Sequence, residues 1–401
     1  MATVALIWEL GSDYGHIGRF LPIALSLRDR GHRPVMILRD ISRADEMLGP
    51  YGLEYLQAPL WLPPVQGLPP ALNFTESLFL FGFLSARGLL SVARAWRALF
   101  SMLKPDLLIF DHAPTALLAS RGFGIPRLIT GNSFAVPPRV SPLPRYRWWE
   151  KKGEPVREKD TEQRLLSNAN EVLKALGSPL LAQVADIYEA ESTLITALPE
   201  LDVYGARPNE NYIGAINSLN HGVSPRWPSC GTMKIFAYLK PHYASFEAVL
   251  GALNRIDASV VVFAPGIAPA IARRFESANL SFSTLPLLMA EVREQCDLGI
   301  CHAGGMVDIM LGAGKPLVLF PMQMEQTMTS RRVELAGCGS WLEQGKSVAE
   351  IERVFRKVLS SPEIAAKAQA YAERNCLFQQ QQSMEKIMGT CENLLQGEHL
   401  H

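Results

Sequence analysis

Short apolar runs alternate with longer amphipathic segments along most of this 401-residue chain. In the first half, the apolar runs predict β-strands over Val4–Glu9, Pro34–Leu38, Leu107–Phe110 and Arg127–Thr130. The segments between them predict helices over Phe20–Arg30, near Ser77–Leu103 and from Pro114. Because strands and helices alternate, we expect a parallel sheet with helices on both faces.

The same alternation starts again after residues 217–231, a segment with Asn, Gly, two Pro and three Ser that we interpret as a linker. Strands are predicted over Lys234–Leu239, Ser259–Phe263, Leu280–Ser283, Leu298–Cys301 and Leu317–Phe320. Helices are predicted over Ala244–Arg255, Ala268–Ala278, Leu287–Gln295 and Met306–Gly312. The pattern thus predicts two doubly wound α/β domains in series, residues 1–216 and 232–362. Residues 363–401 are expected to end in a long helix, Ala365–Leu395, that packs back toward the first domain.

Composition narrows the classes of function. Lys+Arg and Asp+Glu number 39 each, so the chain lacks the basic excess of an electrostatic nucleic-acid binder. All six cysteines follow residue 229 and none forms a CxxC pair, which favours reduced thiols over a disulfide framework or a zinc site. No basic segment precedes the first apolar run, so we expect a cytoplasmic protein.

The segment from Asp297 to Gln326 carries the strongest chemical signal. It predicts a buried strand, a turn with His302 and two glycines, a short helix, a second strand and a polar loop. Glycines let a diphosphate approach the backbone, and a helix N-terminus presents unpaired N–H groups. His302 would add a donor to a phosphate oxygen. The order of elements therefore predicts a site for a phosphorylated ligand.

A second glycine turn, Gly11 to Gly18, follows the first strand. Its glycines, together with Asp40 after the second strand, allow a dinucleotide-binding site, although the spacing is GxxxGxxG and His16 replaces a small residue. His16 follows one strand and Asp111 follows another, so both side chains can project into one crevice at the carboxyl edge of the sheet. A histidine held by a carboxylate is a general base. Each residue also has a plain alternative, His16 in packing and Asp111 as a helix cap.

Several motifs resemble the GT-B glycosyltransferases of the UDP-glycosyltransferase and macrolide-glycosyltransferase group. They are Gly15-His16, Leu21-Pro22 through Arg28, Arg30-Gly31-His32 and the His302 segment. The resemblance implies two Rossmann-like domains that face each other across a cleft, with a C-terminal helix crossing back. It also implies that the first domain binds an acceptor and the second a nucleotide-diphosphate sugar, and that transfer inverts the anomeric centre without a metal or other cofactor.

The resemblance implies a role for individual residues. His16 would deprotonate an acceptor hydroxyl, and Asp111 would be its partner. Glu325 and Gln326 would hydrogen-bond the donor sugar. The remaining residues that we expect at the donor site are Gly15, Lys240, Leu285, Leu287, His302, Ala303, Gly304, Gly305, Met306 and Asp308. No Asp-x-Asp pair occurs, so the sequence indicates no metal for the diphosphate.

The chain departs from the family pattern in its donor half. Met306 and Val307 stand where a Ser or Thr is common, and Asp308 is a substitute for the ribose-binding Glu. Leu285 replaces a base-stacking Trp, so base recognition would rest on the backbone of Leu287 and leaves uracil and thymine open. Lys240, at the end of a strand, is either a contact for the leaving diphosphate or a solvated lysine.

The sequence therefore predicts an inverting glycosyltransferase that uses a UDP- or dTDP-sugar and a hydroxyl-bearing, amphipathic acceptor. Two alternatives stay open: a sugar-nucleotide epimerase or hydrolase, and a non-catalytic nucleotide-sugar-binding partner protein. Residues 139–152 combine basic and aromatic side chains, so this segment is a candidate for peripheral membrane contact, with a solvated loop as the alternative.

Overall fold

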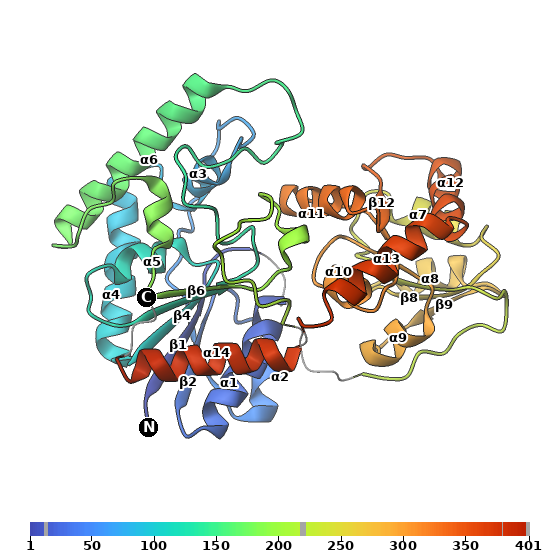
Figure 1. The fold of residues 1–401 in the computed structure, drawn as a ribbon, viewed down its shortest axis with the longest axis horizontal. Helices are drawn as coiled ribbons and strands as arrows, with labels where there is room; N and C mark the ends of the chain where they lie inside the picture. Colours follow the sequence, from blue (N-terminus) through green and yellow to red (C-terminus); the bar gives the residue numbers. More distant parts are fainter. Residues whose placement is uncertain (12–14, 217–221, 379, 398–401) are drawn as a thin grey trace. The chain divides into compact units, whose positions relative to one another are not determined.

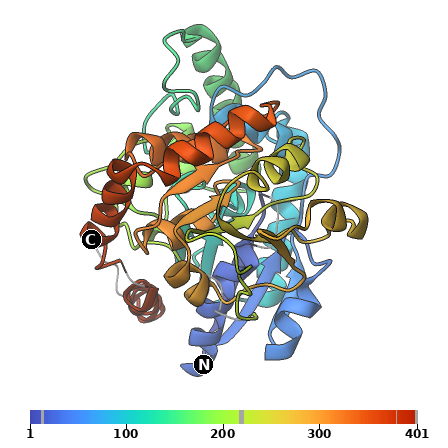
Figure 2. The ribbon, with the colours of Figure 1, turned by 90° about the vertical axis from the view of Figure 1, so that its right-hand side faces the viewer.

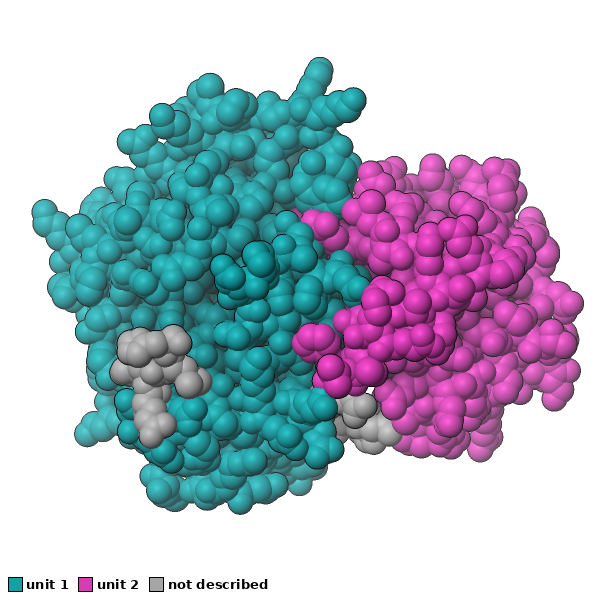
Figure 3. Space-filling model, in the orientation of Figure 1, with its two compact units in different colours: residues 1–218, 379–401 teal, residues 219–378 magenta. Residues whose placement is uncertain are grey.

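The computed structural model describes residues 1–11, 15–216, 222–378 and 380–397. The chain forms two compact units, which Figure 3 shows in teal and magenta. Unit 1 consists of residues 1–218 together with 379–401, and unit 2 of residues 219–378. The first five residues of the predicted linker, 217–221, lie outside the described residues.

Unit 1 is built on a parallel sheet whose inner strands are almost wholly buried. Its strands are β1 (Thr3–Trp8), β2 (Arg33–Leu38), β3 (Glu54–Gln57), β4 (Leu107–Asp111), β5 (Arg127–Gly131) and β6 (Ser192–Ile195). Within the described residues, their order across the sheet is β3-β2-β1-β4-β5-β6. The strand order reverses between β1 and β4, because the chain runs from β1 to β3 toward one edge and from β4 to β6 toward the other. In this pair Trp8 of β1 lies opposite Asp111 of β4.

Helices cover both faces of this sheet, as Figure 1 shows. They are α1 (Gly15–Asp29), α2 (Ala44–Leu48), η1 (Gly49–Tyr51), α3 (Phe74–Leu78), η2 (Phe79–Phe81), α4 (Ala86–Leu103), α5 (Pro114–Ser120), α6 (Pro155–Ala175), η3 (Val184–Tyr188), η4 (Pro199–Leu201) and α14 (Gln380–Leu395). The amphipathic helix α4 buries Leu89, Ala93, Trp96 and Phe100 at helical spacing. That stripe explains why the segment folds as a helix against the sheet.

The predicted continuous helix over Ser77–Leu103 is wrong. The chain bends by 76° between residues 74–81 and 86–103. Gly82 ends the first part with a left-handed φ of 97°. A Cβ there would lie 3.3 Å from Trp61. The break is therefore caused by a glycine that closes the first helix and packs against an indole.

Unit 2 repeats the plan of unit 1. Its strands are β7 (Lys234–Tyr238), β8 (Ser259–Phe263), β9 (Leu280–Ser283), β10 (Leu298–Cys301), β11 (Leu317–Leu319) and β12 (Gly339–Trp341). In the described part of the chain they form a parallel sheet in the order β12-β11-β10-β7-β8-β9. Its helices are α7 (Phe246–Leu253), α8 (Pro269–Phe275), α9 (Met289–Gln295), α10 (Met306–Leu311), α11 (Met324–Leu335), α12 (Val348–Leu359) and α13 (Pro362–Arg374).

The C-terminal segment is two helices and not the single helix predicted over Ala365–Leu395. α13 ends at Arg374 and belongs to unit 2, whereas α14 begins at Gln380 and belongs to unit 1. α14 lies along α1 in Figure 1 and is seen nearly end-on in Figure 2. Two contacts hold it there: the Ser383 hydroxyl donates to the Ile213 carbonyl, and His32 Nε2 lies 3.3 Å from a carboxylate oxygen of Glu392.

Both sheets have one point at which the strand order reverses, between β1 and β4 in unit 1 and between β7 and β10 in unit 2. Ligands of open parallel sheets bind beyond the carboxyl ends of the strands at such points. Asp111 ends β4, and His16 stands in the helix that follows β1. Lys240 comes just after β7 and His302 directly follows β10. The fold therefore brings two pairs of predicted site residues to the two points where ligands are expected.

Candidate active site

His16 is on the first turn of α1, because that helix begins at Gly15 and not near Phe20 as predicted. Trp8, the last residue of β1, stacks on the imidazole with ring centroids 4.9 Å apart and planes 14° from parallel. The His16 side chain is buried. A helix start and a stacked indole therefore fix the direction of this ring.

The structure brings His16 and Asp111 together. His16 Nδ1 lies 2.8 Å from Asp111 Oδ2 in a buried contact. An ionised carboxylate only accepts hydrogen bonds, so in its contact with Asp111 the Nδ1 atom carries the ring proton and donates it. The other nitrogen, Nε2, then keeps its lone pair. This is the tautomer that a general base needs.

Arg19 completes the cluster, and sequence analysis missed it. Its Nη2 donates to Asp111 Oδ2 at 2.8 Å and lies 2.8 Å from His16 Nδ1. Burial alone would raise the pKa of Asp111, but the Arg19 charge first and His16 second outweigh it and hold the pKa well below its usual range. Asp111 is thus ionised at any working pH. The signal in the sequence was the spacing, because residues 16 and 19 share one face of a helix.

Gly11 is a second residue of this site to which the sequence analysis gave no role of its own beyond the start of the glycine turn. Its φ is +96°, a conformation that side chains rarely adopt. A Cβ at this position would stand 2.7 Å from His16 Nε2 and 3.4 Å from His112 Nδ1. Glycine is therefore required both by the backbone and by the two imidazoles beside it.

Glu9, directly after β1, is a buried carboxyl next to this cluster in the chain. Its Oε2 accepts the backbone N–H groups of Thr115 and Ala116, at 2.9 and 3.1 Å, in the first turn of α5. Burial outweighs these hydrogen bonds and raises the pKa of Glu9 to about 7. Between pH 4.5 and 7 the folded protein therefore keeps a proton that the unfolded chain has released.

Replacing Glu9 by Gln should change how stability depends on pH. Since folding takes up the Glu9 proton, rising pH should lower the wild-type free energy of unfolding by about 3 kcal/mol between pH 4.5 and 7. A Gln amide accepts the same hydrogen bonds without ionising, so this part of the decline should vanish in Glu9→Gln. Urea unfolding at pH 5 and pH 8 measures it, with the exposed Glu294→Gln as control. Equal pH slopes for wild type and Glu9→Gln would refute the assignment.

In unit 2, His302 has a different role in the turn from the one predicted. The backbone N–H of Lys240 donates to His302 Nε2 at 2.9 Å, so the proton must be on Nδ1, which donates to the Phe320 carbonyl at 2.7 Å. A neutral imidazole has one N–H, and here it is used within the protein. The expectation of a His302 N–H directed at a phosphate is therefore not met in this structure. His302 instead joins the ends of β7, β10 and β11.

The turn after His302 leaves its glycines facing open space. Ala303 has a left-handed φ of 56°, which is uncommon for a residue with a side chain. A Cβ at Gly304 or Gly305 would meet nothing within 4 Å, and neither glycine has a positive φ. The fold of unit 2 does not itself require glycine at these positions. The two glycines are instead explained by a bound ligand that approaches the backbone closely.

Gly15, also predicted to bind the donor, begins α1 in unit 1. Other predicted donor-binding residues lie on the two helices that follow the turn of unit 2 in the chain. Met306 is buried at the start of α10, and Asp308 is in its first turn. Gln326 is in the first turn of α11, where its Oε1 accepts the Met322 N–H at 2.7 Å, and the half-buried Glu325 precedes it. The oxygen of Gln326 is thus bonded to the loop that precedes α11.

Leu285 and Leu287 lie on the segment between β9 and α9. The Leu285 side chain is 55% exposed, so it is available for contact with a flat ring, whereas Leu287 is buried. Leu287 forms a parallel bridge with Val223, in which Val223 N–H donates to Pro286 and the Val223 carbonyl accepts from Leu288. Because these bonds use the neighbours of Leu287, its own N–H and carbonyl point away from Val223.

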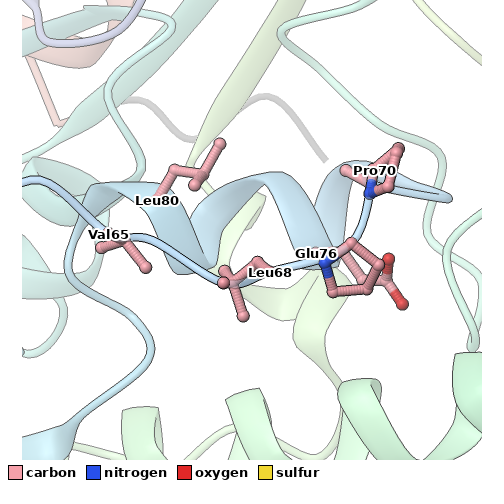
Figure 4. Close-up of a pocket in the computed structure, with 8 residues that line it drawn as sticks. Val65, Leu68, Pro70, Glu76 and Leu80 are labelled. Carbon is pink, nitrogen blue, oxygen red and sulfur yellow. The ribbon is translucent and has the colours of Figure 1, made fainter.

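Unit 1 also contains a cavity of about 310 Å³ (Figure 4). It is lined by Val65, Gly67, Leu68, Pro69, Pro70, Ala71, Glu76 and Leu80. The one carboxylate in its wall, Glu76, is bonded by two nitrogens of Arg157 at 2.5 and 2.9 Å. The lining residues other than Glu76 are thus Val, Leu, Pro, Ala and Gly, and the charge of Glu76 is already paired.

Three of the five basic side chains in segment 139–152 have an acidic partner within unit 1. Arg139 lies 3.3 Å from Glu189, Arg145 lies 3.4 Å from Glu158, and Arg147 lies 3.0 Å from the adjacent Glu150. These pairs reduce the charge that the segment offers to an anionic surface. Among helices in the described residues, none alone has the length and apolarity to span a membrane, and only the bent α3–η2/α4 pair passes on those two criteria together.

The whole chain matches known glycosyltransferase structures in fold. CalG4, the calicheamicin glycosyltransferase, superposes with a TM-score of 0.72 at 18% identity over 98% of both chains. The spinosyn rhamnosyltransferase SpnG, complexed with thymidine diphosphate, superposes with a TM-score of 0.66 at 14% identity over 97% of this chain and 100% of its own. This chain has the GT-B fold. The predicted fold class, two Rossmann-like domains, is thereby confirmed.

Sequence similarity to known proteins covers a much shorter part of the chain than the structural similarity does. No protein-family model matches the chain. One curated relative, NDP-glycosyltransferase YjiC of Bacillus subtilis, is 36% identical over 80 residues, which span 19% of this chain and 20% of that relative. The structural matches and the curated relative both agree with the expected resemblance. The GT-B fold also explains why the two pairs of strand-end residues occur at matching places in the two units.

Proposed function

We propose that this chain is a glycosyltransferase that moves a sugar from a nucleotide-diphosphate donor to an acceptor hydroxyl. The observation that carries the proposal is the buried His16–Asp111 contact of 2.8 Å at the β1–β4 switch point of a GT-B fold. It supplies an oriented base with a free nitrogen at the place where such sheets bind ligands.

The chemistry follows from that tautomer. The acceptor oxygen gives its proton to His16 Nε2 and forms a bond to the anomeric carbon. The bond from that carbon to the diphosphate breaks, and the nucleoside diphosphate leaves with the electron pair. Ionised Asp111 stabilises the imidazolium that forms, since a buried carboxylate next to a new cation is strongly favourable. Attack from the side opposite the leaving group inverts the anomeric centre.

The donor is expected at the turn of unit 2. Open space above Gly304 and Gly305 suits a diphosphate, and the backbone groups of Leu287 that point away from Val223 suit the edge of a base. A fold neighbour, SpnG, is known in complex with thymidine diphosphate, and this supports a dTDP- or UDP-sugar here. In our proposal Glu325 and the amide nitrogen of Gln326 contact the sugar, Asp308 the ribose, and Lys240 the leaving diphosphate.

Neutralisation of the leaving diphosphate is assigned to the protein. Backbone N–H groups at the start of α10 and the Lys240 ammonium are positive groups near the turn. Across the described residues, no three His, Cys, Asp or Glu side chains are grouped so as to hold a metal ion. We therefore propose transfer without a metal cofactor.

The acceptor is expected in unit 1. SpnG is also known in complex with the spinosyn aglycone, an example of an acceptor bound by this fold. In our proposal the apolar cavity between residues 65 and 80 receives an apolar part of the acceptor.

A transfer assay tests the proposal. The intact protein is incubated with UDP- and dTDP-hexoses and a panel of hydroxylated acceptors, with and without EDTA, and products are read by mass spectrometry and by the NMR coupling of the new anomeric proton. We expect an acceptor-dependent glycoside of inverted configuration, formed equally with EDTA. Donor breakdown without a glycoside would instead support the hydrolase or epimerase alternative, and no donor binding would support the non-catalytic one.

A further inference from the structure

His112 is a titratable residue beside the candidate base to which the proposed reaction gives no role. It directly follows Asp111 at the end of β4, and its backbone is left-handed, with φ of 53°. Its carbonyl accepts the Leu10 N–H at 2.9 Å, which continues the β1–β4 pairing beyond the strands. Strained backbone that the surrounding structure holds in place is concentrated at functional sites.

The His112 ring shares its surroundings with His16. Their ring centroids are 6.0 Å apart. Both rings lie beside Gly11, on the side where another residue would carry its Cβ. A Cβ at that position would be 3.4 Å from His112 Nδ1 and 2.7 Å from His16 Nε2. The nitrogen proposed as the base and a second imidazole nitrogen therefore border the same small region.

The rest of the His112 ring is enclosed by aromatic side chains. Phe74 lies 5.7 Å away in a tilted arrangement, and Phe134 lies 6.0 Å away, edge to face. Within the described part of the chain, neither ring nitrogen of His112 has a hydrogen-bond partner. A half-buried imidazole keeps its full hydrogen-bonding capacity in such surroundings.

His112 stays neutral and therefore does not act as a second general base beside His16. Burial, and after it the charge of His16, lowers the pKa of His112 to about 3. At any working pH the ring therefore offers one N–H donor and one lone pair, and it does not compete for the proton that His16 accepts. Two adjacent histidines with separate environments have separate roles.

We propose that His112 is an acceptor-binding residue that hydrogen-bonds a second oxygen next to the reacting hydroxyl. This inference rests on the proposed function and names its substrate class: a flat ring that carries two oxygens on adjacent carbons. Two such oxygens are about 2.8 Å apart, and with one hydrogen bond of about 2.8 Å to each imidazole they fit two rings whose centroids are 6.0 Å apart. The flat ring is assigned from Phe134, the half-buried aromatic side chain beside His112.

Calorimetry on the intact protein tests this with two probes, 7-hydroxycoumarin and 7,8-dihydroxycoumarin, which differ by one adjacent hydroxyl. We expect the wild type to bind the dihydroxy probe about tenfold more tightly, the factor that one good hydrogen bond contributes. His112→Phe keeps an aromatic ring but removes both nitrogens, and it should bind the two probes equally. His112→Asn keeps a polar atom near the Nδ1 position and tolerates a left-handed backbone, so it should retain the preference.

Each outcome decides the matter. Equal affinity of the wild type for both probes, no binding of either, or a preference that survives in His112→Phe would overturn the inference. If His112→Phe does not fold, as judged by its thermal midpoint, His112→Ala replaces it under the same criteria. A binding preference without sugar transfer to either probe would overturn the proposed transferase activity and leave the role of His112 in binding standing.

Discussion

Replacement of His16 by Ala is expected to lower kcat for sugar transfer by about 10²–10⁴-fold, the range that a positioned general base contributes. The reason is local, because Nε2 is the one base nitrogen that the Asp111 contact leaves with a lone pair. The affinity for nucleoside diphosphate should not change, since the turn expected to bind it is in unit 2. Steady-state kinetics with saturating donor, together with calorimetry of dTDP and UDP, measure both quantities.

The partner of His16 provides a matched control for this experiment. Asp111→Asn keeps the size of the side chain but removes the charge and can turn an N–H toward Nδ1, which favours the wrong tautomer. It should therefore lose most of the rate although His16 is intact. Transfer by His16→Ala above about one tenth of the wild-type rate would eliminate the base assignment. If acceptor-independent donor hydrolysis persists at full rate in both variants, water is the preferred nucleophile.

The central strands of both sheets were predictable from the sequence because they are continuous apolar runs buried on both faces. The central strands β8 and β10 have the bounds that the pattern predicts, and so does β9, which lies at an edge but contains the apolar residues Leu280 and Phe282. β3, β6 and β12 were missed, and all three lie at an edge of their sheet. β3, for example, consists of Glu54-Tyr-Leu-Gln57 with three exposed residues. An edge strand has a neighbour on one side only, so its sequence does not need the apolar run that identifies a buried strand.

α11 was missed for a similar reason. Its sequence, Met324 to Leu335, mixes charged and apolar residues without a clear apolar face, and the loop expected there is in fact a helix that carries Glu325 and Gln326. Tertiary contacts, not periodicity, determine such a helix.

Strand-end reasoning found the residues of the candidate site better than it found their partners. His16 and Asp111 meet because two adjacent parallel strands end at the same edge, which the order of elements already implies. The contacts of Arg19 and His112 depend on which way side chains turn from α1 and from a left-handed residue. For His302, the ring is used by the Lys240 N–H and the Phe320 carbonyl. Those partners come from the loops after two other strands, whose paths periodicity does not predict.

Replacing Gly11 by Ala should also abolish most activity, because the new methyl group would displace the His16 imidazole. The new Cβ would stand 2.7 Å from His16 Nε2, closer than real contacts allow, so the imidazole or the loop must move. A displacement of about 1 Å in a catalytic group lowers the rate by about 10²-fold. We expect kcat to fall by about that factor, with acceptor KM also raised because His112 Nδ1 lies 3.4 Å from the same Cβ.

Gly31→Ala separates this effect from backbone strain. Gly31 ends the same helix with a similar φ of +83°, but a Cβ there would meet nothing within 4 Å. Both variants should lose about 1 kcal/mol or more of stability, because both force alanine into a left-handed conformation. Only Gly11→Ala should lose activity in kinetic assays well below the thermal midpoint. Equal losses of rate in the two variants would attribute the effect to strain alone, whereas a Gly11→Ala rate within threefold of wild type would mean that His16 Nε2 is not the reacting nitrogen.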